Sequence, residues 1–350
     1  MRLWLLPLVL LSLLATACGG DVTSAPDGRG LAATEDSGGA DLQVVAAVYP
    51  LDWVAARVAP DAEVDLLNQG SKEAHDIELS PPQRATIETA DVVLYMGDID
   101  YQPQVEDAVA AARGEVVNAV EVAGDDALLA ASADAHAHED EVGAHESEGE
   151  EGKGHPDEQA GGDTEDKGDD PAGGAGGVDP HLWFDTAIMA KVAVATGEAF
   201  ATADPDNAQT YRKNAAAVRE EMAALADDLD RVLGGDCAFD EAIVSHAAYA
   251  YLLRPYGKRQ HAMTNVSAEG DPSPGELANL VREIKEEGFT HVLAEPVEGR
   301  EAAEAVAREA GVKLLEISPL DAVSDGQAAT GLPDLIRAQA DAFATALGCA

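Results

Sequence analysis

Two patterns of hydrophobic and polar positions, short apolar runs and longer amphipathic segments, alternate along residues 41–349. Short apolar runs rich in branched side chains predict buried β-strands, and the longer amphipathic segments between them predict helices. The predicted strands are residues 42–48, 62–67, 91–96, 115–120, 241–245, 261–266, 290–295 and 312–317. The predicted helices are residues 51–58, a segment starting near 80–82, and residues 102–112, 184–202, 205–233, 246–253, 274–287, 300–310 and 332–347. Strands that alternate with helices predict an α/β fold with parallel sheets and flanking helices.

The longest amphipathic segment, residues 205–233, divides the pattern into two halves of similar type. Its apolar positions are spaced alternately by four and three residues, which predicts a helix packed along one side. They are Tyr211, Ala215, Val218, Met222, Leu225, Leu229 and Val232. The length suits a helix that bridges two lobes, although an ordinary helix on a single core is an alternative. We therefore expect an N-terminal lobe at 41–185, a helical region at 186–235 and a C-terminal lobe at 236–350.

An acidic, Gly-rich stretch interrupts the first half near residues 123–178. Loops this long inside a domain are usually functional or disordered, and we expect this one to be both. It carries four histidines, which are common metal ligands, so we interpret it as a metal lure or sensor with weak, exchangeable ligands. These auxiliary ligands are His136, His138, His145 and His155.

The N-terminus has the pattern of a secretory signal. The apolar run 3–14 is shorter than the ~20 residues that a membrane-spanning helix needs. Small residues before Cys18 resemble a bacterial lipobox, although Ala15 stands where Leu is usual. Together with the polar tether 19–40, this predicts a lipoprotein anchored through Cys18, outside the cytoplasmic membrane; an ordinary signal peptide with an incidental Cys is the alternative.

Composition narrows the range of partners. The chain has 350 residues, enough for about two domains, and 46% of them are hydrophobic, enough for real cores. The net charge of −44 argues against nucleic acid or an anionic membrane surface as a partner. In an extracytoplasmic compartment Cys237 and Cys349 can form a disulfide, or they remain two separate thiols.

Three histidines follow predicted strands and are the candidate metal ligands. His75 follows the second strand by a turn, His181 follows the acidic loop, and His246 follows strand 241–245. Ligands of parallel α/β sheets bind at the carboxyl ends of strands, so these imidazoles are expected to converge between two lobes. His261 and His291 are expected outside the site. Three tyrosines near His246 are expected to serve packing: Tyr249, Tyr251 and Tyr256.

Several segments, taken in order, resemble the zinc-binding component of bacterial metal ABC importers, the cluster A-I solute-binding lipoproteins. The motifs are VVAAVYPLDWVAARV, GSKEAHDIELSPPQRATIETADVVLYMG, DPHLWFD, IVSHAAYAYLLRPYG, DPSPGELANLVREIKEEGFTHVLAEP and AREAGVKLLEISPL. The resemblance covers about residues 41–349. It implies two α/β lobes bridged by a long helix, with His75, His181 and His246 as metal ligands. Three imidazoles suit zinc better than manganese, which prefers oxygen ligands.

Two positions depart from the pattern of that family. The residue before the first ligand is often Pro and is Ala74 here, and Ser318 stands where the family often has an Asp before Pro-Leu. The fourth ligand is therefore open between water, Glu73, Glu295 and a loop histidine.

The resemblance implies a high-affinity receptor, not an enzyme, that captures Zn(II) as cargo. It would deliver the ion to the transmembrane subunit of an ABC permease with its ATPase, acting as a monomer that touches the membrane only through a lipid anchor. The alternatives are a receptor for manganese, copper or another divalent metal, and an extracellular zinc-dependent hydrolase with Glu295 as general base. A surface adhesin or zinc buffer is a further alternative.

Overall fold

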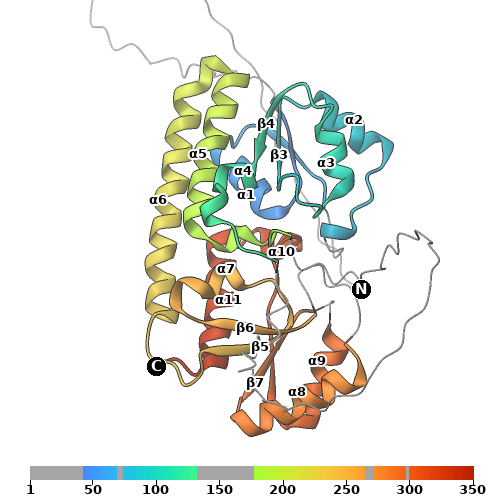
Figure 1. The fold of residues 1–350 in the computed structure, drawn as a ribbon. Helices are drawn as coiled ribbons and strands as arrows, with labels where there is room; N and C mark the ends of the chain where they lie inside the picture. Colours follow the sequence, from blue (N-terminus) through green and yellow to red (C-terminus); the bar gives the residue numbers. More distant parts are fainter. Residues whose placement is uncertain (1–41, 69–73, 132–176, 265–271, 297–298) are drawn as a thin grey trace, which may run out of the picture. The chain divides into compact units, whose positions relative to one another are not determined.

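The computed structural model describes residues 42–68, 74–131, 177–264, 272–296 and 299–350. In the first half, four parallel strands form a sheet in the order β2-β1-β3-β4 (Figure 1). Their bounds are β1 Gln43–Ala46, β2 Glu63–Leu66, β3 Val92–Tyr95 and β4 Glu115–Asn118. Each strand lies inside a predicted strand segment. The central strands β1 and β3 are buried almost throughout, as expected in a sheet that is covered on both faces.

Helices cover both faces of this first sheet. They are α1 Tyr49–Val58, η1 Ala74–Asp76, α2 Pro81–Thr89, α3 Pro103–Val109, α4 Ala119–Ala123, η2 Asp125–Ala127, η3 Leu182–Phe184 and α5 Thr186–Ala203. Val45 packs with residues of α2 and α3, whereas its neighbour Val44 joins the larger core that contains α1 and α5. The Ser80 side chain and Gln83 form a capping box that begins α2, as its Ser-Pro-Pro sequence predicts.

The second half repeats this strand order. Its parallel sheet runs β6-β5-β7-β8, with β5 and β7 at the centre. The strands are β5 Glu241–His246, β6 Arg259–Thr264, β7 His291–Ala294 and β8 Lys313–Glu316. The helices are α7 Ala250–Leu253, η5 Arg254–Tyr256, α8 Pro274–Glu287, α9 Arg300–Ala310, α10 Asp325–Ala328 and α11 Leu332–Leu347. Ile243 of β5 packs with α8 and α9, and Val244 faces the other core, which contains α11.

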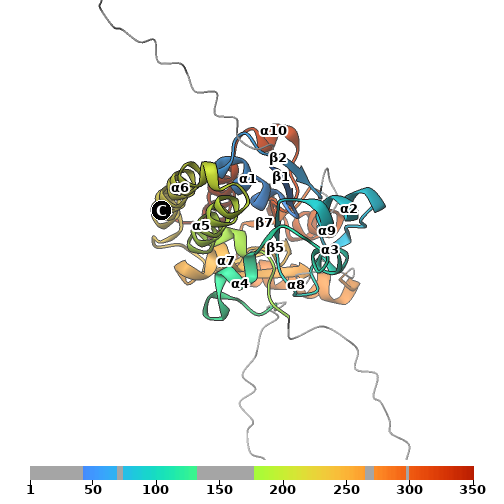
Figure 2. The same ribbon diagram turned by 90° about the horizontal axis from the view of Figure 1, so that it is seen from above.

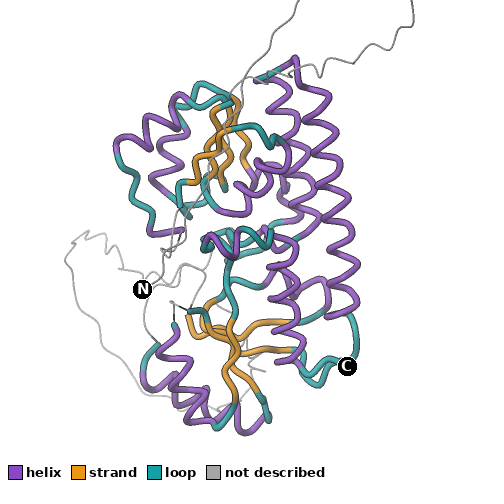
Figure 3. The backbone as a smooth tube through the Cα atoms, turned by 180° about the vertical axis from the view of Figure 1, so that it is seen from behind, coloured by secondary structure: helices purple, strands orange, loops and turns teal. Residues whose placement is uncertain are grey.

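The long helix is α6, Ala208–Leu233, preceded by the short turn η4, Pro205–Asn207. It packs against α5 and α1 of the first half and against α11 of the second, which confirms the predicted bridging helix. Figure 2 shows α6 beside α5, and Figure 3 shows helices that run from the upper sheet toward the lower one. The prediction for the last position of the apolar stripe of α6 is wrong. Leu233 is buried at that end of the helix, whereas the predicted Val232 is only partly buried. Gly197 lets α5 approach closely, because a Cβ added to it would lie 2.6 Å from that of Ala215.

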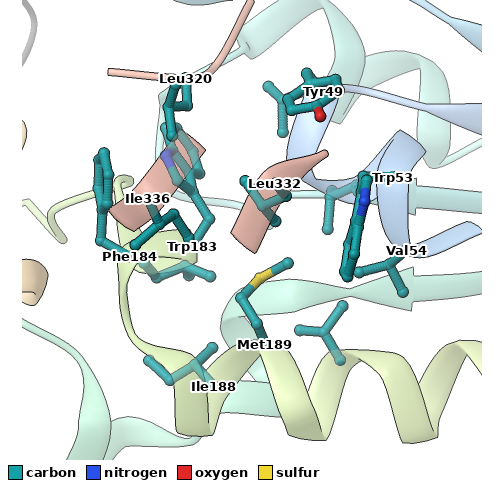
Figure 4. Packing of buried hydrophobic residues seen from close by; sticks show 14 of the residues in the cluster. Tyr49, Trp53, Val54, Trp183, Phe184, Ile188, Met189, Leu320, Leu332 and Ile336 are labelled. Carbon is teal, nitrogen blue, oxygen red and sulfur yellow. The ribbon is translucent and has the colours of Figure 1, made fainter. Parts of the chain in front are cut away.

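A continuous hydrophobic core joins the two halves. Trp53 of α1, Trp183 of η3 and Met189 of α5 lie with Leu332 and Ile336 of α11 in one cluster (Figure 4). Across the same boundary, the indole Nε1–H of Trp183 donates to the Pro319 carbonyl at 2.7 Å. Because interiors of this kind are densely packed, the shared core favours only small relative movement of the halves.

Two further features bear on the expectations from sequence. A disulfide joins Cys237, just before β5, to Cys349, just after α11. None of the helices in the described ranges combines the length and apolar character needed to cross a bilayer. The apolar run 3–14 and Cys18 lie outside the described residues.

The boundaries differ from prediction at the acidic stretch and just before it. The fourth strand ends at Asn118, whose side chain caps α4, so residues 119 and 120 are helical and not extended. Part of the stretch expected to be disordered is regular: η2 follows, and Ala130 pairs with Val178 in an isolated antiparallel bridge. Residues 132–176, with the four loop histidines, lie outside the described residues.

Candidate metal centre

His181 is held in place by Asp179, which lies two positions earlier in the same sequence motif. Asp179 Oδ1 accepts a hydrogen bond from the His181 backbone N–H at 2.9 Å and lies 2.8 Å from the ring Nδ1. Both residues are buried, and Trp183 and Tyr101 pack around the imidazole with ring centroids 5.3 and 6.3 Å away. At the end of the same motif, Asp185 caps α5 through the backbone N–H groups of residues 187 and 188. The motif therefore fixes both the ring and the chain that carries it.

His246 is the last residue of β5 and is also buried. Its Nδ1 lies 3.2 Å from Glu295 Oε1, which also accepts a hydrogen bond from the Tyr249 hydroxyl at 2.9 Å. The backbone N–H of Glu295 donates to Ser245 Oγ at 3.1 Å, which ties the end of β7 to the end of β5. Carboxylate, imidazole and phenol thus form one buried network on the second sheet.

The two imidazoles meet although they come from different halves of the chain. The ring centroids of His181 and His246 lie 5.1 Å apart, with the planes at 76°. Each Nδ1 is engaged by a buried carboxylate, so each ring is oriented to offer Nε2 as the ligand nitrogen. Carboxylate-bound imidazoles of this kind are typical of metal sites, because the carboxylate fixes the tautomer and raises the basicity of the ligand.

A buried carboxylate that the sequence analysis did not select lies at the same place. Asp321 follows β8 by a short turn, and its Oδ2 accepts the backbone N–H of Ala74 at 2.9 Å. Ala74 immediately precedes His75 in η1, so Asp321 connects the segment of the first candidate ligand to the second half. The backbone N–H of Tyr49 donates to the Asp321 carbonyl at 3.0 Å and strengthens that connection.

The carboxyl group of Asp321 interacts electrostatically with other residues of the candidate site. Burial is the largest effect and raises the pKa of this carboxyl group, and the Glu295 carboxylate raises it further. The Ala74 N–H, His181 and the Ala322 N–H act in the opposite direction and lower the pKa. A desolvated carboxylate that is repelled by the charge of a second carboxylate is stabilised by a cation placed among these groups. The set of imidazoles and carboxylates can therefore bind a divalent metal ion.

The acidic stretch leaves the described chain through a narrow neck beside His181. Residues 129–131 pair with residues 177–179, with backbone hydrogen bonds of 2.8 Å from Ala131 N to Gly177 O and from Asp179 N to Leu129 O. The Tyr251 hydroxyl spans the neck, accepting from the Leu129 N–H at 2.9 Å and donating to the Asp179 carbonyl at 3.2 Å. The stretch is thus inserted directly before the motif that carries His181.

The model of the ZnuA family, described as zinc-uptake complex component A, periplasmic, matches residues 44–346. That match covers well over half of the chain. The chain belongs to the ZnuA family. Members of this family are components of an uptake system and not enzymes, so the hydrolase alternative is not supported.

Relatives of the ZnuA family show modest identity. The high-affinity zinc uptake system protein ZnuA of Bacillus subtilis is 27% identical over 343 residues, covering 96% of this chain and 94% of the relative. The zinc-binding lipoprotein AdcA of Streptococcus pneumoniae is 28% identical over 292 residues, covering 83% of this chain. The chain spans only about half the length of the streptococcal relatives it matches, with 52% of AdcA covered.

Solved structures support the fold assignment. The Zn(II)-bound ZnuA-like domain of Streptococcus pneumoniae AdcA matches with a TM-score of 0.64 at 23% identity, covering 88% of this chain and 99% of that domain. The metal-dependent lipoprotein YcdH of Bacillus subtilis matches with a TM-score of 0.65 at 24% identity, covering 87% and 99%. The two-lobed fold with a bridging helix is therefore confirmed as the ZnuA-type fold.

The structure brings some of the predicted site residues together, while others lie outside the described residues. It brings His181 and His246 together, and it ties the His75 segment to Asp321; Glu73 lies outside the described residues. Residues that the sequence analysis missed are Asp179 and Asp321, and Tyr249 and Tyr251 use their hydroxyls in the site's hydrogen bonds in addition to packing. The Asp-x-His spacing of Asp179 was a usable signal, since such an Asp can bond the ring. Asp321 gave no local signal.

Proposed function

We propose that this chain is an extracytoplasmic receptor that captures Zn(II) and delivers it to an ABC-type permease. The observation that carries the proposal is the pair of buried imidazoles, His181 and His246, each held at Nδ1 by a buried carboxylate and brought together from two halves. Zinc favours imidazole nitrogen in near-tetrahedral sites, and carboxylate-held histidines are the usual form of such ligands. The zinc-uptake description of the family supports the same cargo.

The proposed ligands are His75, His181 and His246, with Asp321 as the fourth. Glu295 was one of the candidates from sequence, but its Oε1 is bonded to Nδ1 of His246, on the side of the ring away from Nε2. A metal held by Nε2 is therefore remote from that oxygen, which favours an orienting role for Glu295 over ligation. Asp321 is bonded next to His75 and lies within electrostatic reach of His181, as a ligand shared by the two halves should.

Delivery requires that the ion be released. Protons compete with zinc for imidazole and carboxylate ligands, so acidification should weaken binding. The continuous core between the halves limits opening to small motions, so we propose that a monomeric receptor docks on the permease, which then takes the ion. Cys18 is proposed as the lipid anchor that keeps the receptor at the outer face of the membrane.

The His-rich stretch is proposed to raise the local zinc concentration without forming the tight site. Both ends of the neck are fixed by backbone bonds and by Tyr251, so the site residues do not need the insertion to hold their positions. Deleting residues 132–170 is expected to leave tight zinc binding unchanged, measured by competition with a chelator of known affinity. Loss of the tight ion from that deletion would contradict this role.

The decisive experiment measures metal content and competitive binding of residues 19–350 prepared without metal. The expected result is one tight zinc that is lost in His181→Ala, with looser ions remaining on the loop. Tight manganese in preference to zinc would overturn the cargo, and the absence of any tight site would overturn the receptor role.

The fourth ligand is tested by Asp321→Asn, which keeps an acceptor for the Ala74 N–H but removes the charge. The variant is expected to bind zinc at least about 10-fold more weakly, since removal even of supporting groups costs 10–100-fold. Asp341→Asn on the exposed side of α11 is the matched control and should bind as the unaltered chain does. If Glu295→Gln abolished binding while Asp321→Asn did not, the assignment would be reversed.

A further inference from the structure

A second group of metal-ligating side chains lies away from the candidate centre, on the second sheet. Glu241 of β5, His261 of β6 and Glu283 of α8 place one ligand atom each within 4.8 Å of one another. His261 Nδ1 lies 3.1 Å from Glu283 Oε1. Ligands around tetrahedral zinc, at bond lengths of about 2.0–2.2 Å, are separated by about 3.3–3.6 Å, so small side-chain adjustments would close this group around an ion.

Strand register explains why these three residues converge. His261 pairs with Ile243, and Glu241 precedes Ile243 by two residues, so their side chains are on the same face of the sheet. Ile243 and Ile284 of α8 belong to the same hydrophobic cluster, and Glu283 is the neighbour of Ile284 on that helix. Three separate elements therefore fix the three ligands, which is the arrangement of a built site and not of a flexible surface patch.

The group is separate from the candidate centre. His246 has the opposite parity to Glu241 along β5, so it lies on the other face of the same sheet, which joins the core shared with α11. Along the sheet, His246 pairs with Thr264, three residues beyond His261, or about 10 Å. One ion cannot be shared by the two groups.

Charge at the group favours a cation. Two carboxylates approach a single imidazole, and all three side chains are mostly buried, with 17%, 15% and 27% of the Glu241, His261 and Glu283 side chains exposed. Like charges this close repel each other unless a positive charge lies between them. The Arg259 guanidinium offers only part of that charge, since it is 61% exposed and its Nε lies 3.8 Å from Glu241 Oε1.

We propose that Glu241, His261 and Glu283 form a second, weaker site for a borderline divalent ion, with zinc as the preferred occupant. One imidazole and two carboxylates suit zinc, and the remaining positions are open to water. An open, partly exposed site exchanges its ion faster than the buried centre does. Its existence depends neither on the identity of the cargo nor on the permease.

The test uses the full chain with the four loop histidines replaced by Ala, so that they do not contribute ions. Zinc is titrated by calorimetry into protein that already holds one equivalent, and the expected result is uptake of a second. His261→Ala and Glu283→Gln are each expected to weaken that second step at least about 10-fold and to leave the first ion in place. Co(II) added in the same way should give the absorption of a nitrogen- and oxygen-ligated ion, which His261→Ala removes.

Glu286→Gln, on the exposed side of the same helix, is the matched control and should retain both ions. Thermal unfolding and retention of the first ion report whether a variant is folded, and Glu241→Gln replaces any variant that is not. Failure to bind a second equivalent at millimolar zinc would overturn the proposal. So would a second equivalent that His261→Ala binds as well as the unsubstituted background does, and neither result would affect the receptor role proposed above.

Discussion

The two halves of the chain share one strand order and use it differently. In each, the first strand lies between the second and the third, as β2-β1-β3-β4 and β6-β5-β7-β8. The first strand of the first sheet leads into apolar residues Ala47 and Val48, whereas its counterpart β5 ends on His246. The first half instead supplies its histidines from η1 and from the motif before η3.

The carboxylates are divided in a similar way. Glu295 and Asp321 follow the last two strands of the second sheet, and only Asp179 comes from the first half. The difference teaches that a repeated topology fixes where a site can form, at the carboxyl ends of strands, while the chemistry depends on single residues placed at those ends. Four predictions probe what the two halves contribute to zinc binding and to stability.

The largest expected effect is the loss of one imidazole from either half. His75→Ala and His246→Ala should each weaken zinc binding by more than the about 10- to 100-fold that loss of a supporting group costs, because each removes a proposed direct ligand. Competition with a chromogenic chelator measures both. His291→Ala, on β7 outside the site, should bind normally. If His75→Ala had little effect, the first half would contribute only through His181.

The next effect concerns the disulfide, which closes only the second half. Replacing Cys237 and Cys349 together by Ser removes a cross-link across 112 residues of sequence. Because cross-links of this span stabilise by about 3 kcal/mol or more, the Tm should fall by about 6–12 °C. Scanning calorimetry measures the change. Zinc affinity should stay within about 2-fold, since Cys237 and Cys349 lie away from the ligands, and a larger loss would show that the cross-link positions the site.

A smaller effect compares the two orienting carboxylates. Asp179→Asn and Glu295→Gln should each weaken zinc binding by about 10- to 100-fold, because the imidazole loses its fixed orientation and part of its basicity. Equal losses would show that the halves hold their histidines equally well. Glu287→Gln, at the exposed end of α8, serves as the control. Unchanged affinity in both carboxylate variants would mean that packing alone orients the rings.

The smallest effect is on the metal-free protein. Burial raises the pKa of Asp321 above its value in the unfolded chain, so the native state holds the proton more tightly. Stability from this group is therefore present below the ordinary pKa of an Asp carboxyl group and is lost as pH rises through the higher pKa of the folded state. Asp321→Asn should raise the metal-free Tm at pH 7 by about 2 °C, and the gain should vanish at acid pH. A lower Tm at neutral pH would show that the charge is already compensated.

Most helices and strands could be predicted because the apolar spacing and the end residues that define them lie within each element itself. Helices α8, α9 and α11 begin and end where expected, and the Ser273 side chain caps α8 by accepting a hydrogen bond from the Glu276 N–H. His181 and His246 could be selected as candidates from sequence because each lies in a distinctive motif at the end of a strand or loop.

Asp321 could not be found in that way. Its position depends on Leu320, a non-glycine residue with φ of 66°, which turns the chain after Pro319. The contact that marks Asp321 as part of the site is to Ala74, 247 residues away in sequence. The same holds for Leu233 in place of Val232: packing at the end of α6, not the spacing, decides which side chain is buried.

The neck at Ala130 and Val178 is a suitable place to insert another protein domain. The ends of the insertion are already brought together by the bridge and by Tyr251, so the entropy of closing a longer loop grows only slowly with its length. A fluorescent reporter domain could replace residues 132–176, entering two residues before Asp179 and four before His181. Zinc binding at the metal centre would then be measured as a change in the fluorescence of the inserted domain, and the receptor would serve as a biosensor.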